Sequence, residues 1–144
     1  MEGKDQMKIK AIVLKSPWAE MVASGRKTIE TRTWPTKYRG PLLIIASMNP
    51  KVEVSGKAIA ITFVDDCRVM VKGDESRACC PIYPGAHSWF LSRTKKLASP
   101  FNVKGQLRLF DVDVPDDIDL GDLSNDIATR VAYAFAEMEL NVLD

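Results

Sequence analysis

The stretch that decides the predicted fold is residues 16–34, which read SPWAEMVASGRKTIETRTW. Ser16 followed by Pro17 predicts the start of a helix, because a hydroxyl can cap the first free amides and proline needs no donor there. Gly25 predicts the end of this helix, because glycine adopts the left-handed conformation of a helix stop at little cost. Between them, apolar side chains recur at helical spacing on one face, at Trp18, Met21 and Val22.

The period of the sequence changes after this helix. Side chains alternate over residues 28–34, which is typical of a strand. One face of the strand carries Ile29, Thr31 and Thr33, and the other carries Thr28, Glu30, Arg32 and Trp34. The basic pair Arg26-Lys27 forms the turn between helix and strand. This junction brings an acid, several bases and an indole together, so we predict the functional site there.

Five more strands are expected from apolar runs and alternation, over residues 8–15, 42–47, 56–71, 87–91 and 106–112. The long segment 56–71 is expected to bend near Asp65-Asp66, because strands rarely run that far unbroken. Residues 72–85 are expected to be an irregular loop and a candidate lid, since long ordered loops are often functional.

The chain is expected to end in a helix. After Pro115, apolar residues recur at helical spacing, at Ile127, Val131, Ala134, Phe135 and Met138. The predicted fold class is therefore α+β: a small, partly closed β-barrel of about six strands, with a helix after the first strand and a C-terminal helix. We expect one domain over residues 1–115 and an acidic helical extension, residues 116–144, packed on it.

Composition and charge limit the class of protein. Of the 144 residues, 46% are hydrophobic and 27% charged, which is ordinary for a globular protein. No apolar run approaches the roughly 18 residues of a membrane span. Residues 1–10 are charged and lack an apolar signal region, so we expect a cytoplasmic protein without membrane contact. Residues 1–110 hold 19 of the 20 Lys and Arg against 9 acids, whereas residues 111–144 hold one Arg against 10 acids.

The cysteines do not predict a metal site or a cofactor. The chain has three cysteines, an odd number in a sequence without an export signal, so reduced thiols are expected. Cys79-Cys80 lacks the two-residue spacing of a chelating pair, and His87 is the only histidine.

Several motifs resemble those of one known family. They are Ser16-Pro17-Trp18-Ala19, the spacing Gly25-x-Lys27-x-x-Glu30-x-Arg32-x-Trp34, Arg39-Gly40-Pro41-Leu42, Asp66-Cys67, Trp89-x-Leu91 and Pro100-Phe101. Over about residues 9–112 they make the chain similar to the ASCH domain. The resemblance implies a PUA-like β-barrel, a fold of RNA-binding and RNA-modifying proteins, with a cleft beside the first helix. Some ASCH relatives deacetylate N(4)-acetylcytidine, and a ribonuclease activity has been attributed to others.

The amidohydrolase branch of the family can be compared residue by residue. Its signature resembles Arg26-Lys27-Thr28-Ile29, and its Ile-Tyr-Pro-Gly element matches Ile82-Tyr83-Pro84-Gly85. It has a threonine where this chain has Glu30. Its catalytic glutamate lies on the loop before the Ile-Tyr-Pro-Gly element, where this chain offers Asp74 and Glu75. The candidate catalytic residues are therefore Lys27, Glu30 and Glu75.

The candidate ligand-binding residues surround the same junction. They are Ser16, Trp18, Arg26, Thr28, Arg32, Trp34, Tyr38, Arg39, Ser47 and Tyr83. Trp34 and Tyr38 offer aromatic faces on which any base can stack. Glu30 and Arg32 share a strand face, where they form either an ion pair that shapes the cleft or direct contacts to a ligand.

These observations lead to three hypotheses of function. The first is a module that binds RNA or a nucleotide in a basic cleft. The second is a hydrolase that uses Lys27 on a modified nucleoside, as an N4-acetylcytidine-type amidohydrolase, or on RNA, as a ribonuclease. The third is a protein-interaction domain contacted through the acidic helix. The expected partner is RNA or a nucleoside, and the expected state is a monomer or homodimer. Residues 116–144 are expected to weaken nucleic-acid binding, either by docking acids over the basic cleft or by general repulsion. The alternative is that the helix completes the core, so that its deletion unfolds the domain.

Overall fold

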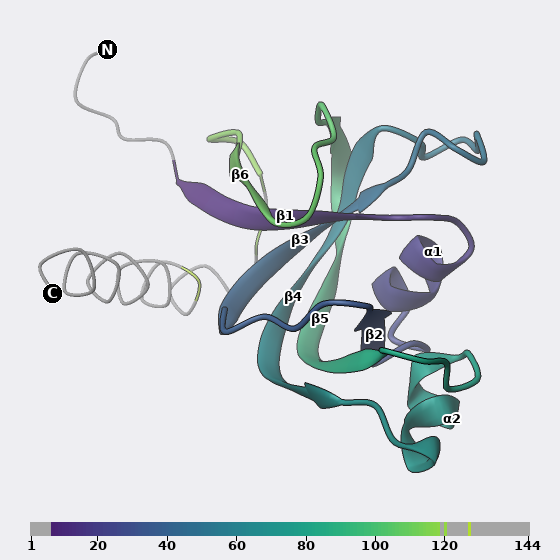
Figure 1. The fold of residues 1–144 in the computed structure, drawn as a ribbon. Coiled ribbons are helices and arrows are strands. Elements are labelled where there is room, and N and C mark those ends of the chain that lie inside the picture. The colour runs from purple at the N-terminus through teal and green to yellow at the C-terminus, as the bar shows by residue number, and fades with distance from the viewer. Residues whose placement is uncertain (1–6, 119, 121–126, 128–144) are drawn as a thin grey trace, which may run out of the picture.

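The computed structural model describes residues 7–118 together with Leu120 and Ile127. This part of the chain forms one six-stranded sheet with short helices (Figure 1). The elements in chain order are β1 (Lys8–Leu14), α1 (Trp18–Ala23), β2 (Ile29–Arg32), β3 (Gly40–Ala46), β4 (Lys57–Val69), the 3-10 helix η1 (Lys72–Asp74), α2 (Glu75–Ala78), β5 (His87–Asn102) and β6 (Phe110–Asp113). The predicted helix after the first strand is present, and so are the six strands.

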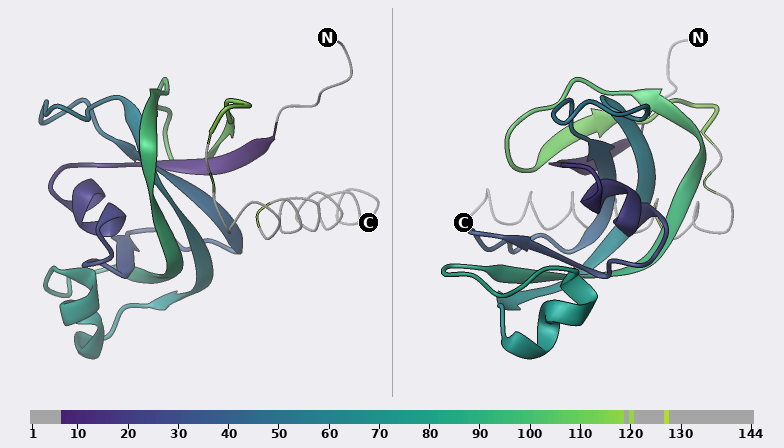
Figure 2. Two further views of the ribbon diagram at one scale, coloured as in Figure 1. Left: turned by 180° about the vertical axis from the view of Figure 1, so that it is seen from behind. Right: turned by 90° about the vertical axis from the view of Figure 1, so that its right-hand side faces the viewer.

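The sheet is open, so the prediction of a partly closed β-barrel is wrong on this point. The strand order is β2-β5-β4-β3-β1-β6, so β2 and β6 are the edges of the sheet. β1 and β3 are parallel, and the other neighbours are antiparallel. Each edge strand has only four residues, and the ladder of β1 with β6 ends at Ala11 and Phe110. The strands curl into an arc but are too short at the edges to pair with each other (Figure 2).

The strand bounds differ from the prediction mainly after residue 91. β5 continues to Asn102, beyond the predicted strand over residues 87–91, because β4 pairs with it along most of its length. The last strand begins at Phe110, so residues 103–109 are a loop and the predicted strand over 106–112 is too long at its start. The bend expected near Asp65-Asp66 is present as a register shift between Val64 and Asp66.

Two apolar clusters cover the two faces of the sheet. Alternation along β1 places Ile9 and Ala11 in one cluster and Ile12 and Leu14 in the other. β3 is buried over its whole length, as expected for a central strand with both faces covered. The second cluster includes Ala19 and other residues of α1, so this helix is fixed against the sheet through its apolar face.

The start of α1 differs from the prediction in one detail. Pro17 occupies the N-cap position, and no side chain caps the first turn. The Ser16 hydroxyl instead donates a hydrogen bond of 2.6 Å to Oε1 of Glu20. The predicted capping role of Ser16 is therefore wrong, because Pro17 holds the N-cap position and no backbone amide of the first turn donates to the Ser16 hydroxyl oxygen. Gly25 follows the helix with a φ of 83°, which confirms the predicted helix stop.

The loop predicted over residues 72–85 is partly helical and is tied to the sheet. Its η1 helix ends at Asp74, a buried carboxylate that accepts hydrogen bonds from the Arg68 guanidinium, the Ser88 hydroxyl and the Val71 amide. Burial alone raises the pKa of Asp74, but these hydrogen bonds outweigh it and hold the pKa below its usual range. Asp74 therefore fixes the base of this loop as a structural anchor.

Most of the predicted C-terminal helix, residues 116–144, lies outside the described residues. Of its apolar stripe, Ile127 is described and is fully buried. Ile127 and Leu120 both belong to the cluster that contains Ile9 of β1. These two side chains therefore complete one face of the core. In the part of the chain that the structure describes, no helix is long and apolar enough to cross a membrane.

Candidate functional site

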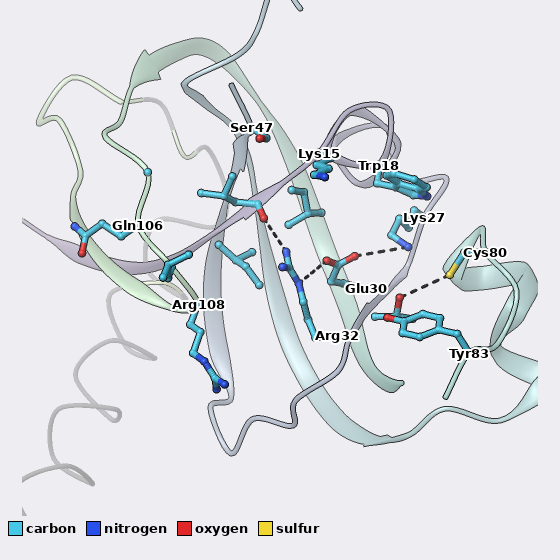
Figure 3. Close-up of a pocket in the computed structure, with 16 residues that line it drawn as sticks. Lys15, Trp18, Lys27, Glu30, Arg32, Ser47, Cys80, Tyr83, Gln106 and Arg108 are labelled. Atoms are coloured by element: carbon cyan, nitrogen blue, oxygen red, sulfur yellow. Dashed lines mark hydrogen bonds and ion pairs between the residues drawn. The ribbon is translucent and has the colours of Figure 1, made fainter. Parts of the chain in front are cut away.

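A cavity of about 630 Å³ opens where the end of β1, the start of α1, β2 and the 103–109 loop meet. Its lining includes Trp18, Lys27, Glu30 and Arg32 from the helix–turn–strand stretch. The junction predicted from the sequence therefore borders a cavity of the size that holds small ligands in proteins. Figure 3 shows the side chains of these four residues converging on it.

A chain of charged side chains forms one wall of the cavity. Nζ of Lys27 lies 3.7 Å from Oε1 of Glu30, and Nε of Arg32 donates a 2.9 Å hydrogen bond to Oε2 of the same carboxylate. The two cations thus take opposite oxygens of Glu30, as the dashed lines in Figure 3 show. The expected ion pair between Glu30 and Arg32 is present, with Lys27 as a third member.

The ends of this charged chain are bound to the backbone. Nη2 of Arg32 donates a 2.7 Å hydrogen bond to the carbonyl of Val13, and Nζ of Lys27 donates one to the carbonyl of Ala78. Lys27 is 2% exposed and Glu30 7%, so both charges are withdrawn from water. Buried charges persist only where they are paired and hydrogen bonded, and here all three side chains are. The array is therefore pre-organised before any ligand enters.

Aromatic and basic residues stand around the charged chain. Trp18 is 38% exposed and Tyr83 is half-buried, and Figure 3 shows them on either side of Lys27. Lys15 and Arg108 are exposed residues of the lining, on opposite sides of Arg32 in the same view. The described lining has four cations and one carboxylate, a formal excess of three positive charges. Such a concave basic surface attracts anions.

Six of the predicted site residues line this cavity. They are Lys27, Glu30, Arg32, Trp18, Ser47 and Tyr83. The hydroxyl of Ser47 accepts a hydrogen bond from the Asn49 amide, which places it at the turn after β3. The roles of these residues remain predictions, but their convergence means that one ligand can contact several of them.

Four predicted residues near the junction lie outside the lining. Oε2 of Glu75 accepts a 2.8 Å hydrogen bond from the backbone amide of Ile82, so this carboxylate braces its own loop. The Thr28 hydroxyl accepts one from Nε of Arg77, and Arg26 is exposed on the turn. Ser16 is buried and bonded to Glu20, as described above. A catalytic role for Glu75 would require this loop to rearrange.

The aromatic and basic residues after β2 are also outside the lining. Trp34 packs edge to face on Trp89, with ring centroids 4.9 Å apart. The Tyr38 hydroxyl donates a 2.6 Å hydrogen bond to the carbonyl of Pro41. Burial, with a smaller contribution from Asp111, raises the pKa of this hydroxyl above its usual value. Arg39 donates two hydrogen bonds to backbone carbonyls of its own loop.

Sequence reasoning missed the 103–109 loop as a wall of the cavity. Gly105, Gln106, Leu107 and Arg108 all line it. Arg108 has a φ of 58°, and its guanidinium stacks 4.7 Å from the centroid of Trp34. A signal was present in Lys104-Gly105, which is typical of a turn, but Leu107 and Leu109 gave the following residues the alternation of a strand.

Two other lining residues were not predicted as site residues. Lys15 follows β1 directly, and nothing in the sequence distinguished it from the other exposed lysines. Cys80 lies with its sulfur 3.7 Å from the Thr31 hydroxyl across the cavity wall. Among the described residues, no three His, Cys, Asp or Glu side chains are grouped as ligands for a metal ion.

Comparison with known proteins bears on the fold and the family of the chain. A family model described as the ASCH domain matches residues 12–101. The crystal structure of ASCH from Zymomonas mobilis aligns with a TM-score of 0.57 at 14% identity, covering 75% of this chain and 88% of that one. A serine-to-alanine mutant of the same protein aligns with a TM-score of 0.53 at 12% identity over 90% of this chain and 94% of that one. At this identity the two structures show a shared fold. No curated protein matches the sequence.

Proposed function

Because the chain belongs to the ASCH domain family, we propose that its cavity binds a nucleotide of single-stranded RNA. The observation that carries this proposal is the buried array of Lys27, Glu30 and Arg32 in the wall of a basic cavity of about 630 Å³. A nucleotide combines a flat ring, a polar edge and a negative charge, and the cavity offers a complement to each.

The charged array suits the polar edge of a base. The Glu30 carboxylate is an acceptor only, whereas Lys27 and Arg32 are donors only. The edge of a base presents the matching pattern: its exocyclic amino group can donate to Glu30, and the neighbouring ring nitrogen or carbonyl can accept from Lys27 or Arg32. Each oxygen of Glu30 contacts one cation, Lys27 or Arg32, and keeps a further lone pair for such a ligand.

The rim of the cavity suits the rest of a nucleotide. Trp18 and Tyr83 stand beside the array, where an unstacked base can lie against an aromatic face. Lys15 and Arg108 are exposed, and neither forms an ion pair with an acid among the described residues. They are therefore available to contact phosphates.

Fluorescence anisotropy with a labelled single-stranded RNA of about ten nucleotides tests this proposal. We expect binding that weakens as salt rises from 50 to 200 mM, because phosphate contacts release counterions. Trp18→Ala should weaken binding by roughly 5- to 100-fold, the range expected for one lost base stack. Val71→Ala, at an exposed apolar position outside the cavity, is the matched control. Absence of binding, or equal affinity of Trp18→Ala and wild type, would refute the proposal.

A second candidate function is hydrolysis of an acylated amino group on a nucleoside. The observation that favours it is the buried Lys27 beside the Glu30 carboxylate, with Nζ 3.7 Å from Oε1, because an amine and a carboxylate in the wall of the cavity can serve as acid and base toward a ligand there. Incubation with N(4)-acetylcytidine, followed by chromatography, tests it. Cytidine release by the wild type, abolished in a folded Lys27→Met variant, would support hydrolysis. No release, with RNA binding intact, leaves binding as the function.

A further inference from the structure

A second cavity adjoins the first and has no role in the function proposed above. Its volume is about 510 Å³, and it lies between the end of β3, the start of β4, the end of β5 and the 103–109 loop. Three residues, Val13, Ser47 and Gly105, line both cavities. The two spaces are therefore neighbours that share one wall.

The shared wall is closed between the loop and β1. Gly105 has no side chain, and a Cβ built on it would lie only 3.2 Å from Cγ2 of Val13. The loop backbone therefore packs directly on the Val13 side chain. A ligand that occupies both cavities must pass on the side of Ser47, the third residue that lines both cavities, which is partly exposed at the turn after β3.

The cation Lys15 lies beside Ser47, where a ligand would pass from one cavity to the other. The Ser47 amide donates a 2.8 Å hydrogen bond to the carbonyl of Leu14, the residue before Lys15. Lys15 is therefore next to Ser47, which lines both cavities, and Figure 3 shows the two on the same side of the charged array. Lys15 is exposed, and its side chain has no hydrogen-bond or ion-pair partner within residues 7–118.

The second cavity has the composition of a site for a base with a flanking phosphate. Ile45, Val103 and the 59%-exposed Met48 give it apolar walls. A methionine thioether makes favourable contacts with aromatic rings and adapts to their shape. Asn102 and Lys104 add an amide and a cation at its exposed side.

We infer that the two cavities hold two successive nucleotides of one RNA strand, with the linking phosphate beside Lys15. This inference rests on the proposed function, because it assigns the first nucleotide to the larger cavity. The ligand is then a strand of at least two nucleotides rather than a free nucleoside. The shared lining at Ser47 places the two cavities side by side, and the cations Lys15 and Lys104 supply the charge that matches the backbone.

Calorimetry with the full chain tests the inference, using the four 5′-mononucleotides and the four corresponding 5′-phosphorylated homodinucleotides. We expect at least one dinucleotide to bind about tenfold or more tightly than its mononucleotide. The double variant Asn102→Trp and Lys104→Ala fills the second cavity and removes its cation. It should bring dinucleotide affinity down to the mononucleotide level while mononucleotide affinity stays unchanged. Lys37→Ala, an exposed lysine outside both linings, is the matched control.

The outcomes separate this inference from the proposed function. If mononucleotides and dinucleotides bind equally well, the second subsite is refuted and the first cavity keeps its role. If the double variant weakens both ligands to the same extent, the second subsite is refuted as well. If no nucleotide or RNA binds, the proposed function fails and this inference fails with it.

Discussion

Arg32 on β2 donates a hydrogen bond of 2.7 Å from Nη2 to the backbone carbonyl of Val13 on β1. β2 is an edge of the sheet, and β1 is next to the opposite edge. The ladder of β1 with β6 stops at Ala11, so the Val13 carbonyl is beyond its reach. The Arg32 side chain therefore connects β2 and β1, which are not paired through their backbones. The same side chain donates a hydrogen bond to Glu30.

This bridge gives a prediction for Arg32→Met. The substitution keeps most of the side-chain volume but removes two hydrogen bonds of a charged donor, so we expect a loss of about 1.5–3 kcal/mol in the free energy of unfolding. RNA affinity should fall as well, because Glu30 loses its orienting partner. Urea unfolding measures the first effect and anisotropy the second. Lys8→Met, which removes only an exposed ion pair with Asp113, should change stability by less than about 1 kcal/mol.

The buried array gives a second prediction, for Glu30→Gln. This change keeps the shape of the side chain but leaves the Lys27 ammonium buried without a counter-charge, so we expect a loss of about 3–5 kcal/mol in the free energy of unfolding. Lys27→Met in the same chain should recover much of this loss, since it removes the unpaired charge. A double-mutant cycle by urea unfolding measures the coupling. Additive effects of the two substitutions would show that Lys27 and Glu30 do not depend on each other.

The hydrogen bonds of Asp74 give a third prediction, which concerns how the free energy of unfolding depends on pH. The folded-state pKa of this carboxyl lies below its ordinary value, so its contribution to stability is complete above pH 3.8 and is lost as pH falls through the folded pKa. Asp74→Asn removes this contribution. The stability difference between wild type and Asp74→Asn should therefore be largest near neutral pH and shrink toward pH 2 to 3. Asp65→Asn, at an exposed position of β4, controls for the loss of one negative charge. A difference that is constant across this range would contradict the assignment.

The site could be predicted from the sequence where local rules and tertiary structure agree. Gly25 marks the helix end, and strand alternation places Glu30 and Arg32 on one face; both follow from backbone geometry within a few residues. The sequence also places the third member of the array, Lys27, near these two residues, but it does not predict which groups Lys27 contacts. Its contacts include the Ala78 carbonyl, 51 residues away, which no local pattern encodes.

The parts that sequence reasoning missed depend on long-range pairing. β5 extends through Thr94 and Lys95 because β4 supplies partners for its backbone, although the polar side chains suggested a loop. Leu107 is the opposite case: its alternation with Leu109 suggested a strand, yet it is 91% exposed at the cavity. The open sheet was missed because edge pairing depends on strand lengths that composition does not fix.

The described residues of the C-terminal segment give a fourth prediction. Ile127 is fully buried in the cluster that also contains Ile9, so Ile127→Ala should lower the free energy of unfolding by about 2–5 kcal/mol. A truncation before Leu120 removes both buried side chains and should unfold the domain or destabilise it more than the single substitution does. Urea unfolding of the single variant is the measurement. A change below about 0.5 kcal/mol would show that Ile127 does not complete the core.

The acids around Ile127 give the last prediction, which concerns nucleic-acid binding. Residues 111–144 hold ten acids and one Arg, and two side chains of this segment, Leu120 and Ile127, are buried in the same cluster as Ile9 of β1. Charges interact over about 10 Å at moderate salt, so the acids are expected to weaken RNA binding. Asn substitution at Asp116, Asp117, Asp119, Asp122 and Asp126 removes five charges and spares both buried side chains. Anisotropy should then show higher RNA affinity and a steeper dependence on salt. Amide substitution of Glu53, Asp65 and Asp66, the exposed acids among residues 7–75, is the control for net charge, compared per charge removed. Equal affinity and equal salt slope in the Asn variant and wild type would refute the masking role.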